Sequence, residues 1–373
     1  MALKSGDWVE VRSKEEILQT LDRDGRLDGM PFMPQMFKYC GTRFKILKRA
    51  HKTCDPVYSI AGRSLPNAVH LNLRCDGLAH GGCNVGCLLF WKEAWLKPVE
   101  DGVAFRTPKV AKPKAKASAA DQASCTEEDV WAGTRRAGES GDANDVRYVC
   151  QTTQLCEFTK PLAWWHMSQY VEDYRSGNIT LLEWFRGVLY AGFGRPFGQR
   201  LRFARHLYDG FQKLTGGPPL PIRKGTVEPG TPTPIATLSL KTGDLVRVKS
   251  HEQILATLDR RNTNRGLFFD VEMVPFCGRV FRVRTPVERF IDEKNGRMKS
   301  LKTPAVILEN VFCQSRYSSC RLFCPRALHS WWREVWLERV PEGDAASLAS
   351  STFATASDEA VGRRTTAAVP ERV

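Results

Sequence analysis

The sequence predicts an α+β protein in which two similar, small β-rich modules, each with a short helix, are separated by a helical insert. Three observations predict this fold class. Residues 3–55 align without gaps with residues 240–292, both segments contain short runs of alternating apolar residues, and a helical pattern occupies part of the chain between them. We therefore expect an internal duplication around a different central segment.

The duplication starts and ends at equivalent places in the two copies. Residues 3–7 read LKSGD and residues 240–244 read LKTGD, so that residue numbers increase by 237 between the copies. The copies end in FWKEAWL at 90–96 and WWREVWL at 331–337. Two copies are too few for a solenoid, so we expect two similar domains.

Composition shifts mark the boundaries of the remaining segments. The chain after the first module is rich in Lys, Pro, Ala, Ser and Gly, which is typical of a flexible linker, and the C-terminal end has a similar character. The predicted segments are module A (1–100), a flexible basic linker (101–145), a helical insert (146–215), a Pro/Gly linker (216–239), module B (240–341) and a disordered tail (342–373).

Capping boxes predict where helices begin. The pattern S/T-x-x-E/Q satisfies backbone N–H groups at a helix start. It occurs at equivalent positions of both modules and once in the insert, in the pairs Ser13 with Glu16, Ser250 with Gln253, and Thr180 with Glu183. A further helix is expected from about 197 to 214.

Alternating apolar residues predict three strands in each module. The expected ranges are 7–12, 42–48 and 68–75 in module A, and 244–249, 279–284 and 305–313 in module B. A Gly-Asp turn that leads into Val-x-Val and several short strands resembles the small SH3-like barrels. This resemblance implies a fold pattern and no chemistry.

The whole arrangement is similar to that of uncharacterised bacterial proteins with paired Cys-bearing modules and a helical middle. The resemblance rests on the duplicated ends, the recurring cysteines and the central capping box described here, and it covers most of the chain. It implies the architecture and transfers no activity.

Bulk properties limit the cellular setting and the partners. The chain has 373 residues and a formal net charge of +14, which favours a polyanionic partner such as nucleic acid. No window is long and apolar enough for a membrane span, and residues 1–7 do not resemble a signal peptide. We therefore expect a cytoplasmic protein whose twelve cysteines are reduced. The oligomeric state does not follow from the sequence.

Eight cysteines recur at corresponding places and are the candidate metal ligands. They are Cys40, Cys75, Cys83 and Cys87 in module A, and Cys277, Cys313, Cys320 and Cys324 in module B. Four thiolates suit a tetrahedral zinc ion, and an iron-sulfur cluster needs the same number of ligands. The competing interpretation is that these residues are small buried hydrophobes, most of all Cys40 and Cys277.

Module A contains further candidate ligands without clear counterparts in module B. His51, Cys54 and His80 are candidates for an altered or additional metal site, although a solvated loop histidine is the competing interpretation for His80. Cys150 and Cys156 either complete a site shared with a module, are reactive thiols, or are simply buried, and burial is the expectation.

Tryptophans near the module ends have two interpretations. Trp91 and Trp95, with Trp332 and Trp336 in the second copy, pack in the cores or form an aromatic platform that stacks on bases or sugars. Core packing is the expectation.

Two functional hypotheses follow. The first is a non-enzymatic binding or assembly protein in which zinc-stabilised modules bind a polyanion or a protein partner. The alternative is a metalloenzyme or iron-sulfur redox protein with its site in module A. The sequence has no P-loop, dinucleotide fingerprint or H-E-x-x-H motif that would indicate a specific reaction.

Overall fold

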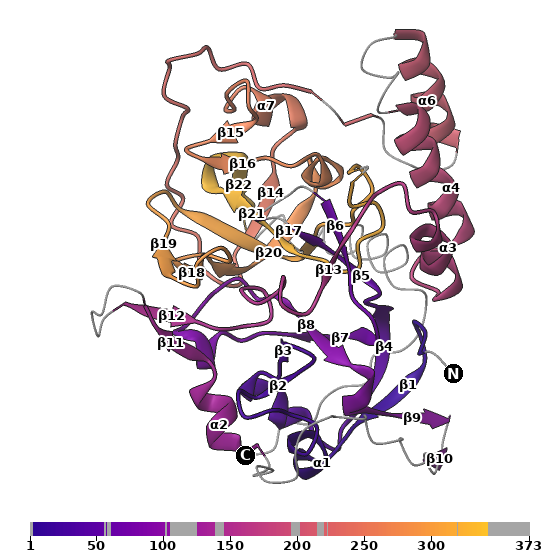
Figure 1. The fold of residues 1–373 in the computed structure, drawn as a ribbon. Coiled ribbons are helices and arrows are strands. Elements are labelled where there is room, and N and C mark those ends of the chain that lie inside the picture. The colour runs from indigo at the N-terminus through magenta and orange to yellow at the C-terminus, as the bar shows by residue number, and fades with distance from the viewer. Residues whose placement is uncertain are drawn as a thin grey trace.

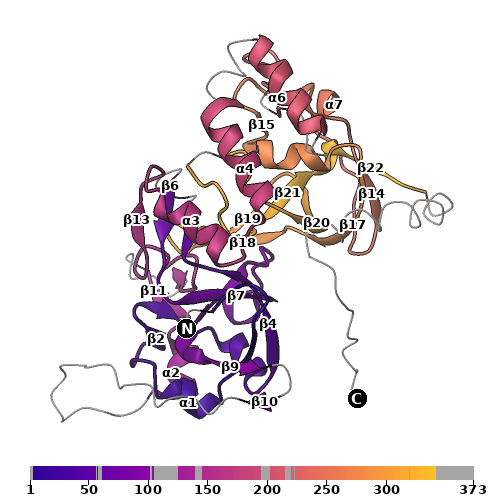
Figure 2. The same ribbon diagram turned by 90° about the vertical axis from the view of Figure 1, so that its right-hand side faces the viewer.

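The computed structural model describes residues 3–55, 57, 61–100, 103–104, 125–138, 145–194, 202–214, 220–221, 223–318 and 320–341. Two β modules lie next to each other along the long axis of the molecule, and the α3, α4 and α6 helices lie beside module B and the boundary between the modules (Figures 1 and 2). The predicted tail and most of the predicted basic linker lie outside the described residues.

Module A is built on a curled antiparallel sheet with the strand order β10-β9-β1-β4-β7-β8. Val9 and Val11 point into the core while Trp8 and Glu10 point outward, as the two-residue period of a strand requires. The strands are β1 (Trp8–Val11), β4 (Arg43–Arg49), β7 (Ala68–Arg74), β8 (Leu88–Lys92), β9 (Leu96–Glu100) and β10 (Val103–Ala104).

Module B repeats five of these strands in the same spatial order, β21-β20-β17-β14-β22. The strands are β14 (Leu245–Val248), β17 (Val280–Pro286), β20 (Ala305–Phe312), β21 (His329–Arg333) and β22 (Leu337–Arg339). β1, β4, β7, β8 and β9 therefore correspond to β14, β17, β20, β21 and β22. This confirms the predicted α+β class and the prediction of two similar β-rich modules.

The short helices α1 (Lys14–Leu18) and α7 (His251–Leu255) begin where the capping boxes predict. The Ser13 hydroxyl accepts a hydrogen bond from the backbone N–H of Glu16, and the Ser250 hydroxyl accepts one from that of Gln253, both at 3.2 Å. Because both motifs depend on neighbouring residues only, the prediction is confirmed in both copies.

Smaller elements complete the modules. In module A they are β2 (Arg26–Leu27), β3 (Met30–Pro31), η1 (Pro34–Tyr39), β5 (Lys52–Asp55), β6 (Ala61–Ser64), η2 (Leu78–His80) and η3 (Glu93–Trp95). In module B they are β15 (Thr263–Asn264), β16 (Leu267–Phe268), η5 (Val271–Phe276), β18 (Arg289–Ile291), β19 (Met298–Ser300) and η6 (Glu334–Trp336). These η elements are 3₁₀ helices.

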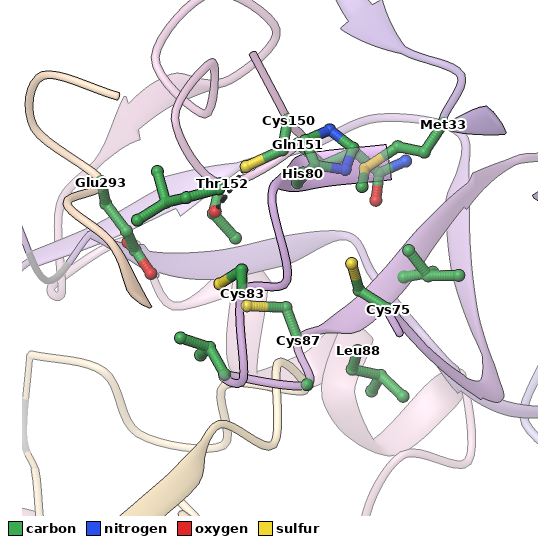
Figure 3. Close-up of a pocket in the computed structure, with 14 residues that line it drawn as sticks. Met33, Cys75, His80, Cys83, Cys87, Leu88, Cys150, Gln151, Thr152 and Glu293 are labelled. Atoms are coloured by element: carbon green, nitrogen blue, oxygen red, sulfur yellow. Dashed lines mark hydrogen bonds between the residues drawn. The ribbon is translucent and has the colours of Figure 1, made fainter. Parts of the chain in front are cut away.

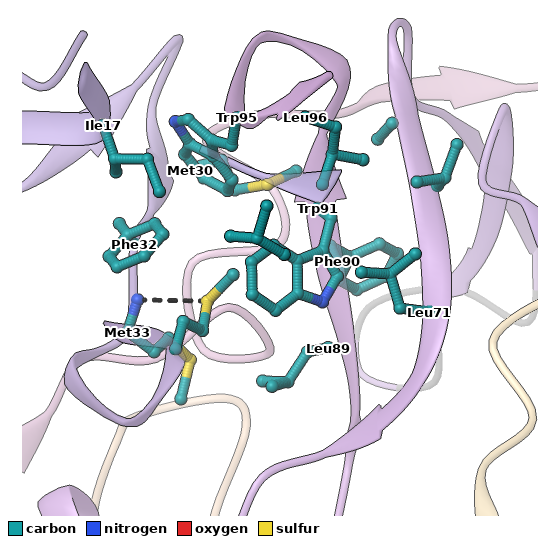
Figure 4. Packing of buried hydrophobic residues seen from close by; sticks show 14 of the residues in the cluster. Ile17, Met30, Phe32, Met33, Leu71, Leu89, Phe90, Trp91, Trp95 and Leu96 are labelled. Carbon is teal, nitrogen blue, oxygen red and sulfur yellow. Dashed lines mark hydrogen bonds between the residues drawn. The ribbon is translucent and has the colours of Figure 1, made fainter. Parts of the chain in front are cut away.

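Each module has its own core, built around a pair of tryptophans (Figure 4 for module A). Trp91, Trp95, Trp332 and Trp336 are all 0% exposed. The Trp95 indole donates to the Thr20 hydroxyl at 3.1 Å, and Trp336 makes the same bond in module B at 2.9 Å. Core packing is therefore confirmed, and a stacking platform at these tryptophans is excluded because no ring face is accessible.

The central segment contains α2 (Glu127–Ala132), β11 (Arg135–Ala137), β12 (Val146–Tyr148), β13 (Lys160–Leu162), α3 (Ser168–Arg175), α4 (Leu181–Leu189), the π-helical η4 (Tyr190–Gly194) and α6 (Arg202–Leu214). α4 begins at the predicted Thr180 box. The range predicted to be a helical insert thus also holds β12 and β13, and β13 extends the β5–β6 hairpin of module A.

Residues inside the predicted basic linker are folded, which corrects that prediction. α2 begins at a capping box formed by Thr126 and Asp129, and Val130 and Cys125 are buried against the core of module A. Two buried apolar side chains were too weak a pattern to predict this helix. None of the helices in the described part of the chain is long and apolar enough to span a bilayer.

Candidate functional site

Each module extends a hairpin to the cysteine-bearing loop of the other module. Arg326, in the loop between β20 and β21 (cysteine loop B), donates to the backbone oxygen of Cys54 on β5 at 3.2 Å. Asn84, in the loop between β7 and β8 (cysteine loop A), exchanges hydrogen bonds of 2.9 Å with the backbone of Arg289 on β18. Because β18 is the counterpart of β5, the exchange is reciprocal.

Three cysteines of loop A lie around one cavity, and we refer to Cys75, Cys83 and Cys87 as cluster A. The cavity has a volume of about 30 Å³ and is also lined by Cys150 of the central segment and Ile291 of module B (Figure 3). The backbone N–H of Cys75 donates to the Cys87 oxygen at 2.8 Å, which fixes the two ends of the loop together. Three parts of the chain therefore line the cavity.

A glycine allows loop A to fold back on itself. Gly77 has φ +75°, and a Cβ atom at this position would lie 2.1 Å from the backbone oxygen of Cys83. No side chain is accommodated at that distance, and the left-handed conformation also favours glycine. The close approach of Gly77 to Cys83 is what brings Cys83 back toward Cys75.

His80 lies in the wall of the same cavity and is only 1% exposed. Its Nε2 faces the backbone oxygen of Val149 at 3.0 Å, so that nitrogen carries the proton. Its Nδ1 is buried and has no hydrogen-bond partner among the described residues. Burial lowers the pKa of His80, so the imidazole is neutral and Nδ1 has a free lone pair.

The thiols of cluster A are protonated in this environment. Burial raises the pKa of Cys75 to about 12, raises the pKa of Cys83, and raises that of Cys87 well above its ordinary value. A buried dication would reverse this preference, because it stabilises thiolates and displaces their protons.

The second group of cysteines is cluster B, defined as Cys313, Cys320 and Cys324 of loop B. Cys54 of module A lies beside it. The proximity of Cys324 lowers the pKa of Cys54, and the proximity of Cys54 adds to the raised pKa of Cys324. The backbone oxygen of Cys320 approaches Gly62, which pairs with Cys54 across the β5–β6 hairpin. Both clusters therefore border the contact between the modules.

Two arginines give cluster B a positive environment. Arg326 is 1% exposed and pairs with Glu293 at 3.2 Å, and Arg321 lies 3.7 Å from Asp270. Besides the neighbouring Cys324 thiol, the charges of Arg326 and Arg321 lower the pKa of Cys54. Cys54 is thus the thiol of this group that most readily becomes a thiolate.

Cys40 and Cys277, the other two predicted ligands, lie elsewhere. Each is the C-cap residue of a 3₁₀ helix, η1 or η5, and each packs against the hydrophobic core of its own module. Cys40 has Lys14 and Glu15 as charged neighbours. In module A the structure therefore groups three of the four predicted cysteines. In module B it places loop B, which carries three of the four predicted cysteines of that module, next to the β5–β6 hairpin.

His51, Cys54 and His80, predicted as an additional site, occupy three separate places. His51 Nε2 lies 3.2 Å from the Asp173 carboxylate, Cys54 lies beside cluster B, and His80 lies in the cavity of cluster A. Cys150 is buried as expected, whereas Cys156 is exposed. All twelve cysteines lie in the described part of the chain, and none of them is in a disulfide bond.

Within the described residues, no group of three or more His, Cys, Asp or Glu side chains is arranged closely enough to hold a metal ion. No protein-family model and no curated protein matches the chain.

Proposed function

We propose that the protein is a non-enzymatic binding or assembly protein whose two half-barrel modules, SH3-like in this proposal, are stabilised by zinc at clusters A and B. The observation that carries the zinc site is the cavity of cluster A, which three thiols and an imidazole with an unpartnered nitrogen line together. Thiolates and imidazole are the ligands that zinc prefers, and sites in which the protein supplies all four ligands are structural rather than catalytic.

The size of the cavity favours a single ion over an iron-sulfur cluster. A volume of about 30 Å³ holds two or three water-sized groups, since one such group needs roughly 10–15 Å³. A cubane of four irons and four sulfides is much larger. Because the ligand side chains are not grouped closely enough to hold an ion as they lie, this proposal requires the cysteine side chains to rotate until their thiols are about 2.3 Å from zinc.

The charge of module B supports a polyanion as the partner. Arg247, Arg282 and Arg284 are exposed and lie on the outward face of β14 and β17. A bulge in the pairing of β17 with β20 falls at Arg284. The outward face of the equivalent strands in module A carries Glu10, Lys45 and Leu47 at the positions of Arg247, Arg282 and Arg284, so only one of these three positions is basic in module A.

Few acidic groups balance this basic face. Arg247 and Arg284 make no ion pair within the described residues. The acidic residue opposite Arg247 in the sheet register is Glu338, and the nearby Asp244 forms its ion pair with Arg339. Burial lowers the pKa of Arg74, at the module boundary, to about 10, and the charge of Arg284 lowers it as well. A bound polyanion would relieve this repulsion between cations.

The metal part of the proposal is tested by elemental analysis of full-length protein purified without air. We expect one zinc ion for each cluster and no visible absorption. Iron with acid-labile sulfide and a colour that dithionite bleaches would instead support the redox alternative. Protein without any metal would overturn the zinc assignment.

The partner is tested by fluorescence anisotropy with labelled single-stranded and double-stranded oligonucleotides at several salt concentrations. Replacing Arg247, Arg282 and Arg284 by Ala should lower the slope of log K against log salt by about 2–3, because each lost phosphate contact removes nearly one counterion. A control with the same charge change replaces three exposed lysines, Lys4, Lys160 and Lys302. Equal losses in both variants, or no binding by the wild type, would count against this surface.

A further inference from the structure

We propose that each zinc ion takes its fourth ligand from outside its own module, Cys150 at cluster A and Cys54 at cluster B, so that metal binding links the modules. This inference rests on the zinc sites of the proposed function and changes their composition. The sequence pattern instead assigns Cys40 and Cys277 to these positions. The two assignments predict different behaviour for the same set of variants.

At cluster B the position of Cys54 supports this assignment. Cys54 is buried on β5 of module A, and the backbone oxygen of Cys320 approaches Gly62, which pairs with Cys54 in the β5–β6 hairpin. Arg326 holds the β5 backbone at this place through the oxygen of Cys54. With its backbone held against loop B, Cys54 would reach a shared ion by rotation of its side chain.

Lys52 strengthens the same contact between β5 and loop B. Its ammonium group donates to the backbone oxygen of Leu322 at 2.8 Å and pairs with Asp173 at 2.5 Å, and Lys52 is only 3% exposed. The hairpin that carries Cys54 is therefore held at two points, at Lys52, which lies two residues before Cys54, and at the carbonyl group of Cys54 itself.

At cluster A the corresponding position of module B is occupied by Ile291, which is the counterpart of Cys54 in the duplication and which lines the cavity. Isoleucine offers no ligand. Cys150 lines the same cavity from the central segment, together with all three thiols of cluster A. The two sites thus obtain a fourth thiol from different parts of the chain.

The backbone around Cys150 is held in place by hydrogen bonds. The Cys150 N–H donates to the Thr153 hydroxyl at 2.9 Å, and the Val149 N–H donates to the oxygen of Thr134 at 2.8 Å. His80 donates to the Val149 oxygen, so the imidazole supports the segment that carries Cys150. Its unpartnered Nδ1 makes His80 the rival fourth ligand at cluster A.

Neither site can be completed by an isolated module if this assignment is right. Module B would lack Cys54, and module A would lack Cys150. Because a ligand that binds only the assembled state stabilises that state, zinc would hold the two modules and the central segment in one arrangement.

The first test compares the zinc content of four single variants of the full chain after dialysis against a chelator, measured by elemental analysis and native mass spectrometry. We expect Cys54→Ser and Cys150→Ser each to lose one zinc ion, and Cys40→Ser and Cys277→Ser to keep the wild-type content. The opposite pattern would overturn this inference and leave zinc binding intact. A wild type without zinc would instead overturn the proposed function.

A second measurement decides the question if the Cys54 or Cys150 variants do not fold. The double variant Cys40→Ala/Cys277→Ala should retain both zinc ions, with an average of four sulfur ligands in its X-ray absorption spectrum. Loss of zinc from this variant would restore Cys40 and Cys277 as ligands. A site with three sulfurs and one nitrogen would assign His80 in place of Cys150 and overturn the inference at cluster A.

Discussion

The buried ion pair between Lys52 and Asp173 offers the sharpest test of how the modules are joined. The two groups lie 2.5 Å apart, and their side chains are 3% and 0% exposed. Lys52 also donates to the oxygen of Leu322 and lies 4.9 Å from the ring centre of Tyr170. One ammonium group thus connects module A, α3 and loop B.

Lys52→Met removes the cation and leaves the Asp173 carboxylate buried with His51 as its remaining neighbour. Burial lowers the pKa of Lys52 and Asp173 raises it, so the charged form of the lysine depends on this partner. Removing one member of a buried pair costs about 3–5 kcal/mol because the other charge stays unpaired. The double variant Lys52→Met/Asp173→Leu removes both charges and should recover most of this loss.

The assay is urea unfolding of the full chain at pH 7.5, followed by tryptophan fluorescence. An exposed pair, Arg260 with Glu228, whose side chains are 65% and 74% exposed, provides the control. Arg260→Met should change the free energy of unfolding by less than about 1 kcal/mol. A loss of under about 1 kcal/mol for Lys52→Met, or a double variant as unstable as the single one, would refute the reasoning.

Two further perturbations follow from buried polar groups. Burial lowers the pKa of both His70 and His329 to about 3. Below about pH 6.5 the unfolded chain therefore binds protons at these two histidines that the folded chain does not bind. The stability that the two buried neutral imidazoles contribute is complete above that pH and decreases as the pH falls toward 3. Lowering the pH from 7.5 to 5.5 should reduce the free energy of unfolding by about 2–3 kcal/mol through these two histidines together. His70→Gln should remove about half of that decrease. Urea midpoints that shift equally in wild type and variant would contradict this. Gln151 is 3% exposed and makes three hydrogen bonds to the backbone of β3 and β8. Gln151→Leu should cost about 3 kcal/mol or more, because three buried backbone groups lose their partners. Gln154→Leu, at a half-buried position, is the matched control in the same denaturation assay, and equal losses in the two variants would show that the burial of these groups does not matter.

Local features of the fold could be predicted because their causes lie within a few residues. The box of Ser13 and Glu16 starts a helix in module A, and that of Ser250 and Gln253 starts its equivalent in module B. Alternating apolar residues locate the main strands for the same reason, since each side chain alternates between core and solvent. The repeated sequence then requires two similar sheets, because equal patterns bury equal faces.

The candidate site could be predicted only in part. The triplet of Cys75, Cys83 and Cys87 follows from one loop, and Gly77 folds that loop back on itself. Cys40 recurs in both copies like the triplet, yet it caps η1 and packs against the core. Spacing along the chain does not show which way a cysteine faces after the strands are paired.

The sequence by itself determined the duplication, the strand pattern, the helix starts and the two cysteine triplets. Only the tertiary structure decided that each module extends a hairpin to the cysteine loop of the other, so that Cys54 of module A lies with Cys324 of module B. The contact joins residues 270 positions apart, and its geometry depends on the docking of two complete modules. No local pattern specifies such a contact, because packing between surfaces far apart in the chain decides it.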